Sequence, residues 1–288
     1  MPVTKNSKVT YSIPLRQMWE IFRKWGATRK EKSGDVFYAE ARRFAFMQPN
    51  QEIQKAEILS LNFWYADFKH KFRHIWFEQK ELYDFLGEIP LKDLANIKQY
   101  LKENGDQEHT QDIDQLPYIK YSIALHIPFE EIGLAYSFAL MPDETVALFF
   151  VSDDGVGQIH ELQYEEAKKG TDESSIGVVR NFRLAVNLLA YMACFPECVK
   201  DGVPDTNNAT SYRVKGDSVI LKTSDKVKET AKGTKRPHFR KGYFKRLTSE
   251  FYTHMRGQII FVSETSVNSQ SKTVEMSDDD KKLSDFKN

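Results

Sequence analysis

The chain has 288 residues, and its 41 basic and 41 acidic side chains give it a formal net charge of zero at pH 7. This balance excludes a protein that coats nucleic acid with its whole surface, and a hydrophobic content of 41% excludes a disordered chain. With two cysteines, no apolar leader and no uninterrupted apolar span, the sequence predicts a cytoplasmic protein without a disulfide framework and without a membrane segment.

The first hundred residues are predicted to be helical. Apolar side chains recur at helical spacing from Leu15 to Phe22, Gly26 follows as a stop signal, and a second helix is expected over residues 35–46. The aromatic-rich stretch 62–87 is interpreted as one helical stripe that packs in the core, formed by Phe68, Phe72, Ile75, Trp76, Leu82 and Leu86. A further helix is expected over residues 91–101. We therefore predict a helical, aromatic-rich region over residues 1–105, which is a candidate for a separate subdomain.

Beyond residue 105 the apolar period changes from 3.6 to 2. Residues 119–127 and 134–140 alternate between apolar and polar or small side chains, and residues 145–151 form a nearly continuous apolar run. Turn signals separate these segments and precede a short strand over residues 157–162. This pattern predicts an antiparallel meander.

A long apolar helix is predicted after the meander. It covers residues 178–193, has little room for a polar face and ends at Pro196, so we expect it to lie across the sheet. A hairpin over residues 211–222, a strand over 258–262 and a disordered tail over 269–288 follow. The expected fold class is α+β, with an α+β domain over residues 106–268 that ends in a basic, strand-rich segment.

The histidine and cysteine pairs do not predict a metal site. His70 and His74 stand at i, i+4 spacing on the expected helix, but the three neighbouring cations would repel a metal, and a solvated basic face is the better interpretation. His126 and His160 lie in strand patterns, where a surface or a satisfied core position is expected. Cys194 and Cys198 are interpreted as buried residues at a helix end, because a zinc site needs two more ligands. No metal and no cofactor is expected.

Positive charge is concentrated near the C-terminus. Residues 226–256 hold ten Lys or Arg and two Glu, a local balance of about +8. Basic side chains at this density contact phosphates, and neighbouring aromatic rings offer faces for unpaired bases. The predicted nucleic-acid-binding residues are Lys235, Arg236, His238, Arg240, Lys241, Tyr243, Phe244, Lys245 and Arg246, with Tyr243 and Phe244 as the stacking residues. A solvated strand whose charges serve solubility is the alternative.

Residues 235–244, KRPHFRKGYF, resemble the C-terminal signature K-R-P-H-x-R-[RK]-G-H-W of a phage- and plasmid-borne family. Its named members are type V-A anti-CRISPR proteins, and the resemblance implies binding to the nascent N-terminal peptide of the CRISPR effector nuclease, followed by loss of its messenger RNA. The resemblance is strong over these ten residues and weaker from about residue 116 onward. Tyr243 and Phe244 replace the second histidine and the tryptophan of the signature.

These observations lead to three hypotheses. The first is an anti-defence regulator of a mobile element, active in the bacterial cytoplasm. It binds RNA or the ribosome through the basic C-terminal segment, recognises a target polypeptide and lowers expression of that target. The second is a metal-independent ribonuclease centred on His238 with Arg240 and Tyr243, although a tyrosine with an ordinary pKa near 10 is a poor acid–base partner at neutral pH. The third is a protein that blocks a defence protein by direct contact. The missing histidine favours binding over catalysis.

Overall fold

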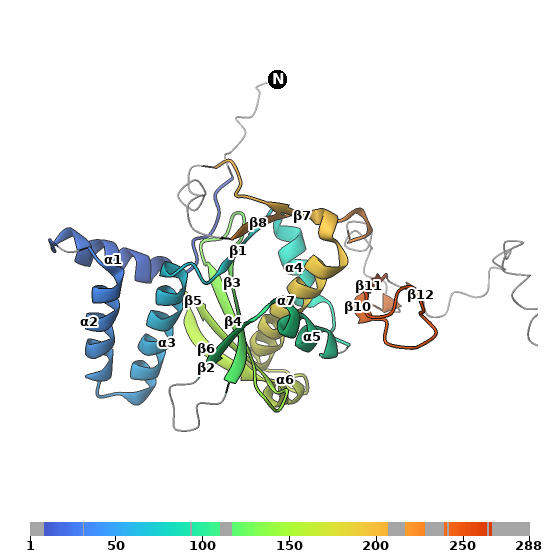
Figure 1. The fold of residues 1–288 in the computed structure, drawn as a ribbon, viewed down its shortest axis with the longest axis horizontal. Coiled ribbons are helices and arrows are strands. Elements are labelled where there is room, and N and C mark those ends of the chain that lie inside the picture. Colours follow the sequence, from blue (N-terminus) through green and yellow to red (C-terminus); the bar gives the residue numbers. More distant parts are fainter. Residues whose placement is uncertain are drawn as a thin grey trace, which may run out of the picture.

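A computed structural model of the chain describes residues 9–30, 32–92, 94–109, 117–206, 217–227, 239–240, 242–263 and 265–266. Three N-terminal helices, a central eight-stranded sheet covered by further helices, and a small C-terminal hairpin follow one another along the chain (Figure 1). The predicted α+β class and the helical N-terminal half are confirmed. No helix in the described part of the chain is long and apolar enough to cross a membrane.

The N-terminal unit consists of α1 (Arg16–Ala27), α2 (Gly34–Phe46) and α3 (Gln51–Phe68). The side chain of Asn50 caps α3 by accepting hydrogen bonds from the backbone N–H groups of Glu52 and Ile53. Aromatic side chains from all three helices meet edge to face around Trp64, which is fully buried. The first two predicted helices are therefore confirmed, and their aromatic residues form a local core.

The central sheet contains β1 (Arg73–Phe77), β2 (Asp106–His109), β3 (Pro117–His126), β4 (Leu134–Leu140), β5 (Val146–Ser152), β6 (Gly155–His160), β7 (Val199–Asp201) and β8 (Ser218–Leu221). Its order is β6-β5-β4-β3-β1-β8-β7, and β2 pairs with the beginning of β3. Strands β3 to β6 form the antiparallel meander that the sequence predicts. Strand β1 lies parallel to both of its neighbours, β3 and β8.

Residues 62–87 are not one helix, so this prediction is wrong. Helix α3 ends at Phe68, because His70 adopts a left-handed backbone conformation with φ of 57°. Strand β1 follows, and α4 (Lys80–Glu88) begins after it. Side chains on both faces of β1 are buried, so its sequence shows no alternation and resembles part of a helical stripe. Since β1 lies inside the sheet, the packing shows no division at residue 105.

Helices cover both faces of the sheet. On one face, α7 (Glu173–Cys194) packs together with α4, α5 (Ala95–Asn104) and α6 (Glu161–Ala167), and Asp172 caps its first turn. On the other face, α3 packs through Phe63 and Ala66. The predicted apolar helix across the sheet is confirmed, and a 3₁₀ turn, Pro196–Cys198, follows it.

The C-terminal hairpin is formed by β10 (Tyr243–Arg246) and β11 (Ile259–Val262). A second short pair joins β9 (Phe239–Arg240) to β12 (Thr265–Ser266). The hairpin lies at the opposite end of the molecule from α1 to α3 (Figure 1). The strand predicted at residues 258–262 is confirmed. The turn of the predicted hairpin over 211–222 and the tail over 269–288 lie outside the described residues.

Candidate functional site

The described part of the predicted nucleic-acid site is strand β10 and the loop that follows it. Lys235, Arg236, His238 and Lys241 lie outside the described residues, and only the backbone of Arg240 is placed, in β9. The remaining four predicted residues, Tyr243, Phe244, Lys245 and Arg246, make up β10. Their predicted extended conformation is confirmed, so their side chains alternate between the two faces of the hairpin.

Phe244 faces the protein interior. Its side chain is 4% exposed and lies 5.2 Å, centroid to centroid, from Phe261 and 6.4 Å from both Tyr191 and Phe195. Lys245, the next residue, is exposed. The prediction that Phe244 stacks on a base is therefore wrong, because this ring anchors the hairpin to the end of α7. An alternating strand buries one of two adjacent side chains, and here it buries the aromatic one.

Tyr243 is half-buried beside a lysine. The ammonium of Lys92 lies 4.9 Å from the centroid of its ring, at the distance of a cation–π contact. This contact occupies part of the tyrosine surface that the sequence assigns to a base. The role of Tyr243 in stacking stays a prediction.

The glycine that precedes β10 is required by the close packing of the hairpin. A Cβ atom on Gly242 would lie 2.6 Å from the ring of Phe261 and 3.0 Å from the carbonyl oxygen of Val262. Real Cβ atoms do not approach neighbours this closely, so any larger residue would displace Phe261. This glycine belongs to the sequence signature, and its role here is to let the two strands approach.

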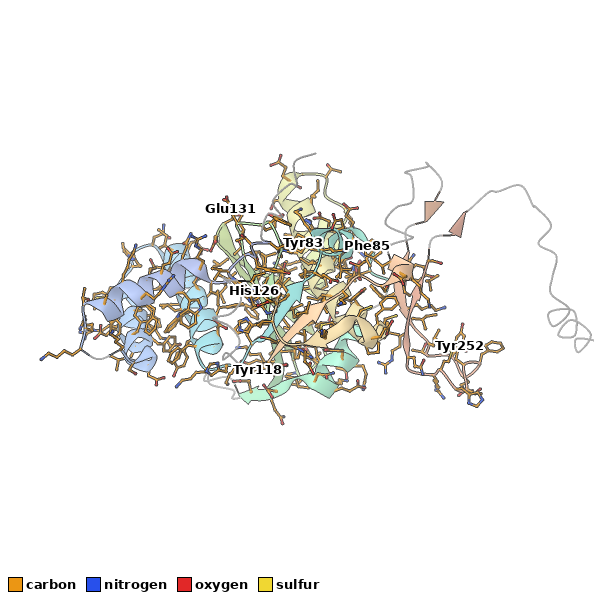
Figure 2. All side chains as sticks on the ribbon, turned by 90° about the horizontal axis from the view of Figure 1, so that it is seen from above. Tyr83, Phe85, Tyr118, His126, Glu131 and Tyr252 are labelled. Carbon is orange, nitrogen blue, oxygen red and sulfur yellow. The ribbon has the colours of Figure 1, made fainter. Side chains whose placement is uncertain are left out.

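The loop between β10 and β11, residues 247–258, exposes the aromatic surface that β10 does not. Phe251 is 86% exposed and lies 5.6 Å from Tyr252 in an edge-to-face pair. Tyr252 is at the outer margin of the molecule, away from the sheet (Figure 2). Backbone hydrogen bonds from Tyr252 to Ser249 and from Gln258 to Met255 hold the loop in consecutive turns. Sequence reasoning missed Phe251, although an aromatic pair inside a polar loop could have indicated it.

Charge surrounds this aromatic pair. Lys245 and Arg256 are exposed, Arg246 is half-buried, and Glu250 is the one acidic residue within 242–263. Three cations against one anion leave the described hairpin with a net charge of +2. A positive surface with an exposed aromatic ring is the combination that binds single-stranded nucleic acid.

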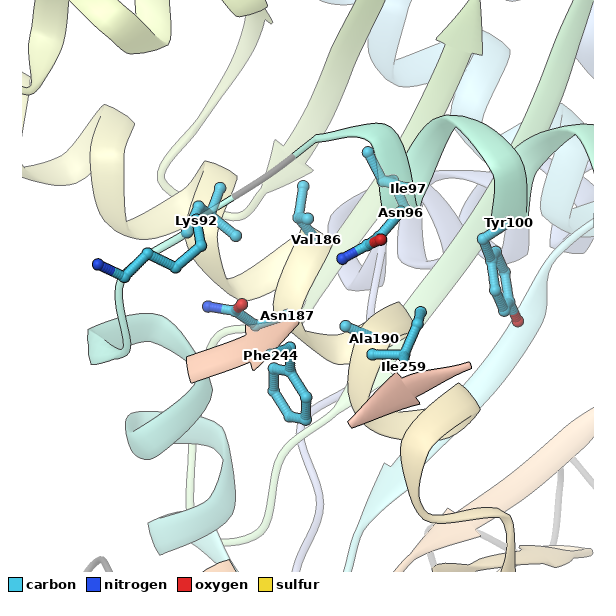
Figure 3. Close-up of a pocket in the computed structure, with 10 residues that line it drawn as sticks. Lys92, Asn96, Ile97, Tyr100, Val186, Asn187, Ala190, Phe244 and Ile259 are labelled. Atoms are coloured by element: carbon cyan, nitrogen blue, oxygen red, sulfur yellow. The ribbon is translucent and has the colours of Figure 1, made fainter. Parts of the chain in front are cut away.

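A small pocket lies beneath the hairpin, between α5, α7 and the two strands (Figure 3). Asn187 is buried there and donates hydrogen bonds of 3.0 Å to the carbonyl oxygens of Leu86 and Ile89. Asn96 is 5% exposed, and its Oδ1 has no hydrogen-bond partner among the described residues. The pocket volume of about 10 Å³ fits one water molecule. It is a small gap in the packing between the hairpin and the helices, and it is too small for an organic ligand.

A second group of polar side chains is buried where α3 meets the central sheet. His74 in β1 places its Nε2 2.9 Å from Oδ1 of Asp67 at the end of α3, and its Nδ1 2.9 Å from Nε2 of His126 in β3. The indole of Trp19 donates to Oδ2 of Asp67 over 2.9 Å. Nδ1 of His126 lies 3.0 Å from the carbonyl oxygen of Ser12. We call Trp19, Asp67, His74, His126 and Ser12 the histidine network.

The hydrogen bonds of this network define where its protons lie. The carbonyl oxygen of Ser12 can only accept, so Nδ1 of His126 is protonated and, in the neutral ring, Nε2 accepts from Nδ1 of His74. The other nitrogen of His74 faces the carboxylate of Asp67, and a proton between these two atoms makes their approach attractive. The network therefore joins α1, α3, β1, β3 and the N-terminal segment through directional bonds.

The interpretation of His70 and His74 as one solvated face of a helix is wrong. His70 is exposed in the turn after α3, whereas His74 is 2% exposed in the sheet. His126 is fully buried and hydrogen-bonded, which confirms a satisfied core position. Local sequence patterns could not predict this pairing, because the two histidines are separated by 52 residues.

The cysteines are free thiols at the end of α7. Cys198 is buried, and burial raises the pKa of the Cys194 thiol to about 11, so it is protonated at neutral pH. A protonated thiol is a poor metal ligand and a poor nucleophile. No group of three His, Cys, Asp or Glu side chains that could hold a metal ion occurs among the described residues.

Comparison with known proteins gives no match: no family model, no curated protein and no solved structure is similar to this chain. The hairpin with its exposed Phe251 and surrounding cations is accordingly the candidate site, defined by its own geometry.

Proposed function

We propose that this protein is a regulator of gene expression that binds RNA, free or in the ribosome, through its basic C-terminal segment. The observation that supports this most directly is that the hairpin buries one set of side chains and exposes another. Phe244 is buried in the core, while Lys245, Arg256 and the ring of Phe251 point to solvent. The hairpin is thus a folded support that presents cations and an aromatic face together.

The chemistry of RNA fits such a surface. Phosphates along a single strand repeat the negative charge that Lys and Arg neutralise, and every base offers a face to an aromatic ring. The described hairpin carries a net charge of +2, and seven further Lys and Arg precede it, three in residues 226–232 and four in residues 235–241, where the signature begins. We assign stacking to Phe251 in place of Phe244.

The resemblance of residues 235–244 supplies the biological setting of the proposal. It suggests a protein of a mobile element that lowers expression of a host-defence protein, such as a CRISPR effector nuclease, after recognising its nascent peptide. Binding of RNA or the ribosome would hold the regulator near that peptide. Tyr243, with Lys92 against its ring, suits a binding role better than proton transfer.

An inhibitor that acts by protein contact alone is the second candidate. A groove of about 620 Å³ runs between α4, α7 and the β5–β6 turn. Lys80 bridges Asp84 and Glu130 at 3.0 Å each along this groove, and Phe129 beside it is 63% exposed. A groove with alternating charges and an exposed apolar edge is suited to a peptide segment.

Fluorescence anisotropy with a labelled single-stranded RNA of about 12 nucleotides tests RNA binding directly. The variant K245E/R246E/R256E reverses three charges of the hairpin. The matched control R23E/K24E/R43E reverses three exposed charges on α1 and α2, at the other end of the molecule. Both variants therefore change the net charge by the same amount.

We expect the hairpin variant to bind RNA at least tenfold more weakly and to reduce the salt slope of log K by about 2, since each lost phosphate contact contributes about 0.7. The control should retain the affinity of the parent. Equal losses in both variants would mean that net charge alone is measured and would contradict the proposal. Absence of RNA binding by the parent, with a stable protein complex on co-purification, would favour the second candidate.

A further inference from the structure

The central sheet has a gap on one edge of β3. Strand β2 pairs with residues 117–120 of β3, and β1 pairs with residues 123–126. On this edge no described strand pairs with Tyr121 and Ser122, which lie between the two. A cleft of about 310 Å³ opens at the gap, and its lining includes Lys71, Arg73, Asp106, Glu108, Lys120 and Asp217.

Most charges in this cleft are paired across its walls. Lys71 Nζ lies 2.8 Å from a carboxylate oxygen of Glu108, and Arg73 Nε lies 3.3 Å from one of Asp217. Lys120, which is half-buried, forms no ion pair with a described residue. No carboxylate among the described residues thus forms an ion pair with the Lys120 ammonium, although Asp106 and Glu108 line the same cleft. A partly buried ammonium group of this kind is stabilised by an anion.

Lys120 also lines a second, apolar pocket. This pocket has a volume of about 150 Å³, lies between α3 and the sheet, and is lined by Leu59, Phe63, Ala66 and Phe149 among others. Lys120 is thus the residue shared by a polar cleft and an apolar pocket. Burial lowers the pKa of Lys120 from its ordinary value, and Lys71 lowers it further while Glu108 opposes the shift. Glu108 therefore compensates only part of the cost of burying this ammonium group.

We propose that Lys120 is the anchor of a binding site for a small organic monocarboxylate that carries a short apolar group. The carboxylate pairs with the Lys120 ammonium in the gap of the sheet, and the apolar group fills the pocket against Leu59 and Phe63. A single negative charge is preferred to a phosphate dianion because Asp106, Glu108 and Asp217 line the same cleft. This site is independent of the hairpin and of RNA.

Hexanoate is a suitable probe, and hexanol is its neutral counterpart. Titration of the full chain, followed by two-dimensional NMR, measures binding of each compound up to about 10 mM. We expect saturable binding of hexanoate with a Kd of about 1 mM or tighter, shifts confined to β2, β3 and α3, and weaker binding of both hexanol and inorganic phosphate.

Variants separate the two halves of the site. Lys120→Met removes the charge and should weaken hexanoate binding about tenfold or more, and Leu59→Ala should weaken it about threefold through lost apolar contact. The control Lys98→Met removes another half-buried lysine, which is paired with Glu161 at 3.0 Å, and should leave the Kd unchanged. Urea unfolding confirms that each variant is folded before titration.

Three results would overturn the site: no saturable binding of hexanoate to the parent, equal affinity of parent and Lys120→Met, or tighter binding of inorganic phosphate than of hexanoate. The first and third results are measured on the parent protein alone. The proposal can therefore be contradicted even if a variant fails to fold.

Discussion

The N-terminal helices and the C-terminal hairpin both pack aromatic residues against the central sheet domain, but the helices and the hairpin are attached to it in different ways. The helices are joined by the histidine network, in which Asp67, His74 and His126 are each at most 2% exposed. The hairpin is joined mainly by apolar side chains, with Phe244 and Phe261 packed against Phe195. Its strands pair with one another and not with the sheet.

The two kinds of attachment differ in how strictly they fix the orientation of the attached element. Hydrogen bonds between buried groups tolerate one geometry, because any other arrangement leaves a polar atom without a partner. Apolar contacts depend on area and tolerate small displacements. The N-terminal helices are therefore a fixed part of the scaffold, whereas the hairpin can vary its outer surface without disturbing the sheet. A surface of that kind is suited to recognition.

The largest effect is expected from Asp67→Ala, which removes the carboxylate that faces His74. Breaking one partner of a buried pair leaves an unmatched polar group and costs about 3–5 kcal/mol of the free energy of unfolding. Urea unfolding followed by circular dichroism measures this loss. The release of α1 should accompany it, because Trp19 donates to the same carboxylate.

Glu40→Ala is the matched control for Asp67→Ala. Glu40 also accepts a hydrogen bond from an indole, that of Trp25, and pairs with Arg29, but its side chain is 36% exposed. An exposed pair contributes about 0–1 kcal/mol. Similar losses in the two variants would contradict the special role of the buried network in fixing the helices.

Phe244→Ala is expected to act on the hairpin alone. Loss of a buried phenylalanine costs about 3–5 kcal/mol where the site cannot collapse. Because the hairpin pairs with no strand of the sheet, the cost should appear as local undocking, with faster hydrogen exchange of amides in residues 243–262. Protection in β3 and β4 should stay at the parent level. Loss of protection throughout the sheet would show that the hairpin is an integral part of the core.

Much of the sheet domain follows from local patterns. The meander β3–β6 alternates visibly or forms apolar runs between turn signals, and α7 is an apolar segment long enough to cross the sheet. Strand β1 was missed because both its faces are buried, which removes the period of two, and because Ile75 and Trp76 matched a helical spacing. Its parallel pairing with β3 and β8 is a long-range choice that no local window contains.

The backbone conformation of the candidate site could be predicted from the sequence, but the direction in which its side chains point could not. Alternation in residues 243–246 indicated a strand, but not whether Phe244 or Lys245 would face inward, since one step of register exchanges the two faces. The histidine network could not be predicted from local sequence patterns, because its residues come from five separate segments. The cleft at Lys120 depends on where β2 ends and β1 begins, which only the pairing of the sheet determines.

A smaller effect is expected from Gly242→Ala, which tests how tightly the hairpin is packed. The added methyl group would meet the ring of Phe261, and overpacking of this kind costs about 1–3 kcal/mol. Hydrogen exchange in β11 should report the loss. The double variant G242A/F261L should recover part of it, because leucine removes the ring atoms that clash. Additive losses in the double variant would place the strain elsewhere.

The smallest effect concerns Lys120, in the seam between α3 and the sheet. Since burial lowers its pKa in the folded state, the unfolded chain binds more protons between the two pKa values, and stability rises with pH there. The cost of Lys120 is fully present below its folded pKa and disappears as the pH rises through its unfolded pKa. Lys120→Met should therefore be more stable than the parent near neutral pH, and the advantage should shrink toward about pH 10.

Urea unfolding at several values between about pH 7 and pH 10 measures this trend. Lys245→Met, on the exposed face of the hairpin, controls for the loss of a positive charge. A constant difference between Lys120→Met and the parent across this range would mean that the effect comes from packing and not from the buried charge. A difference that shrinks only for Lys120→Met would show that the contact between α3 and the sheet holds a charge destabilised by burial. The hairpin, in contrast, exposes its charges to solvent, where a polyanion can reach them.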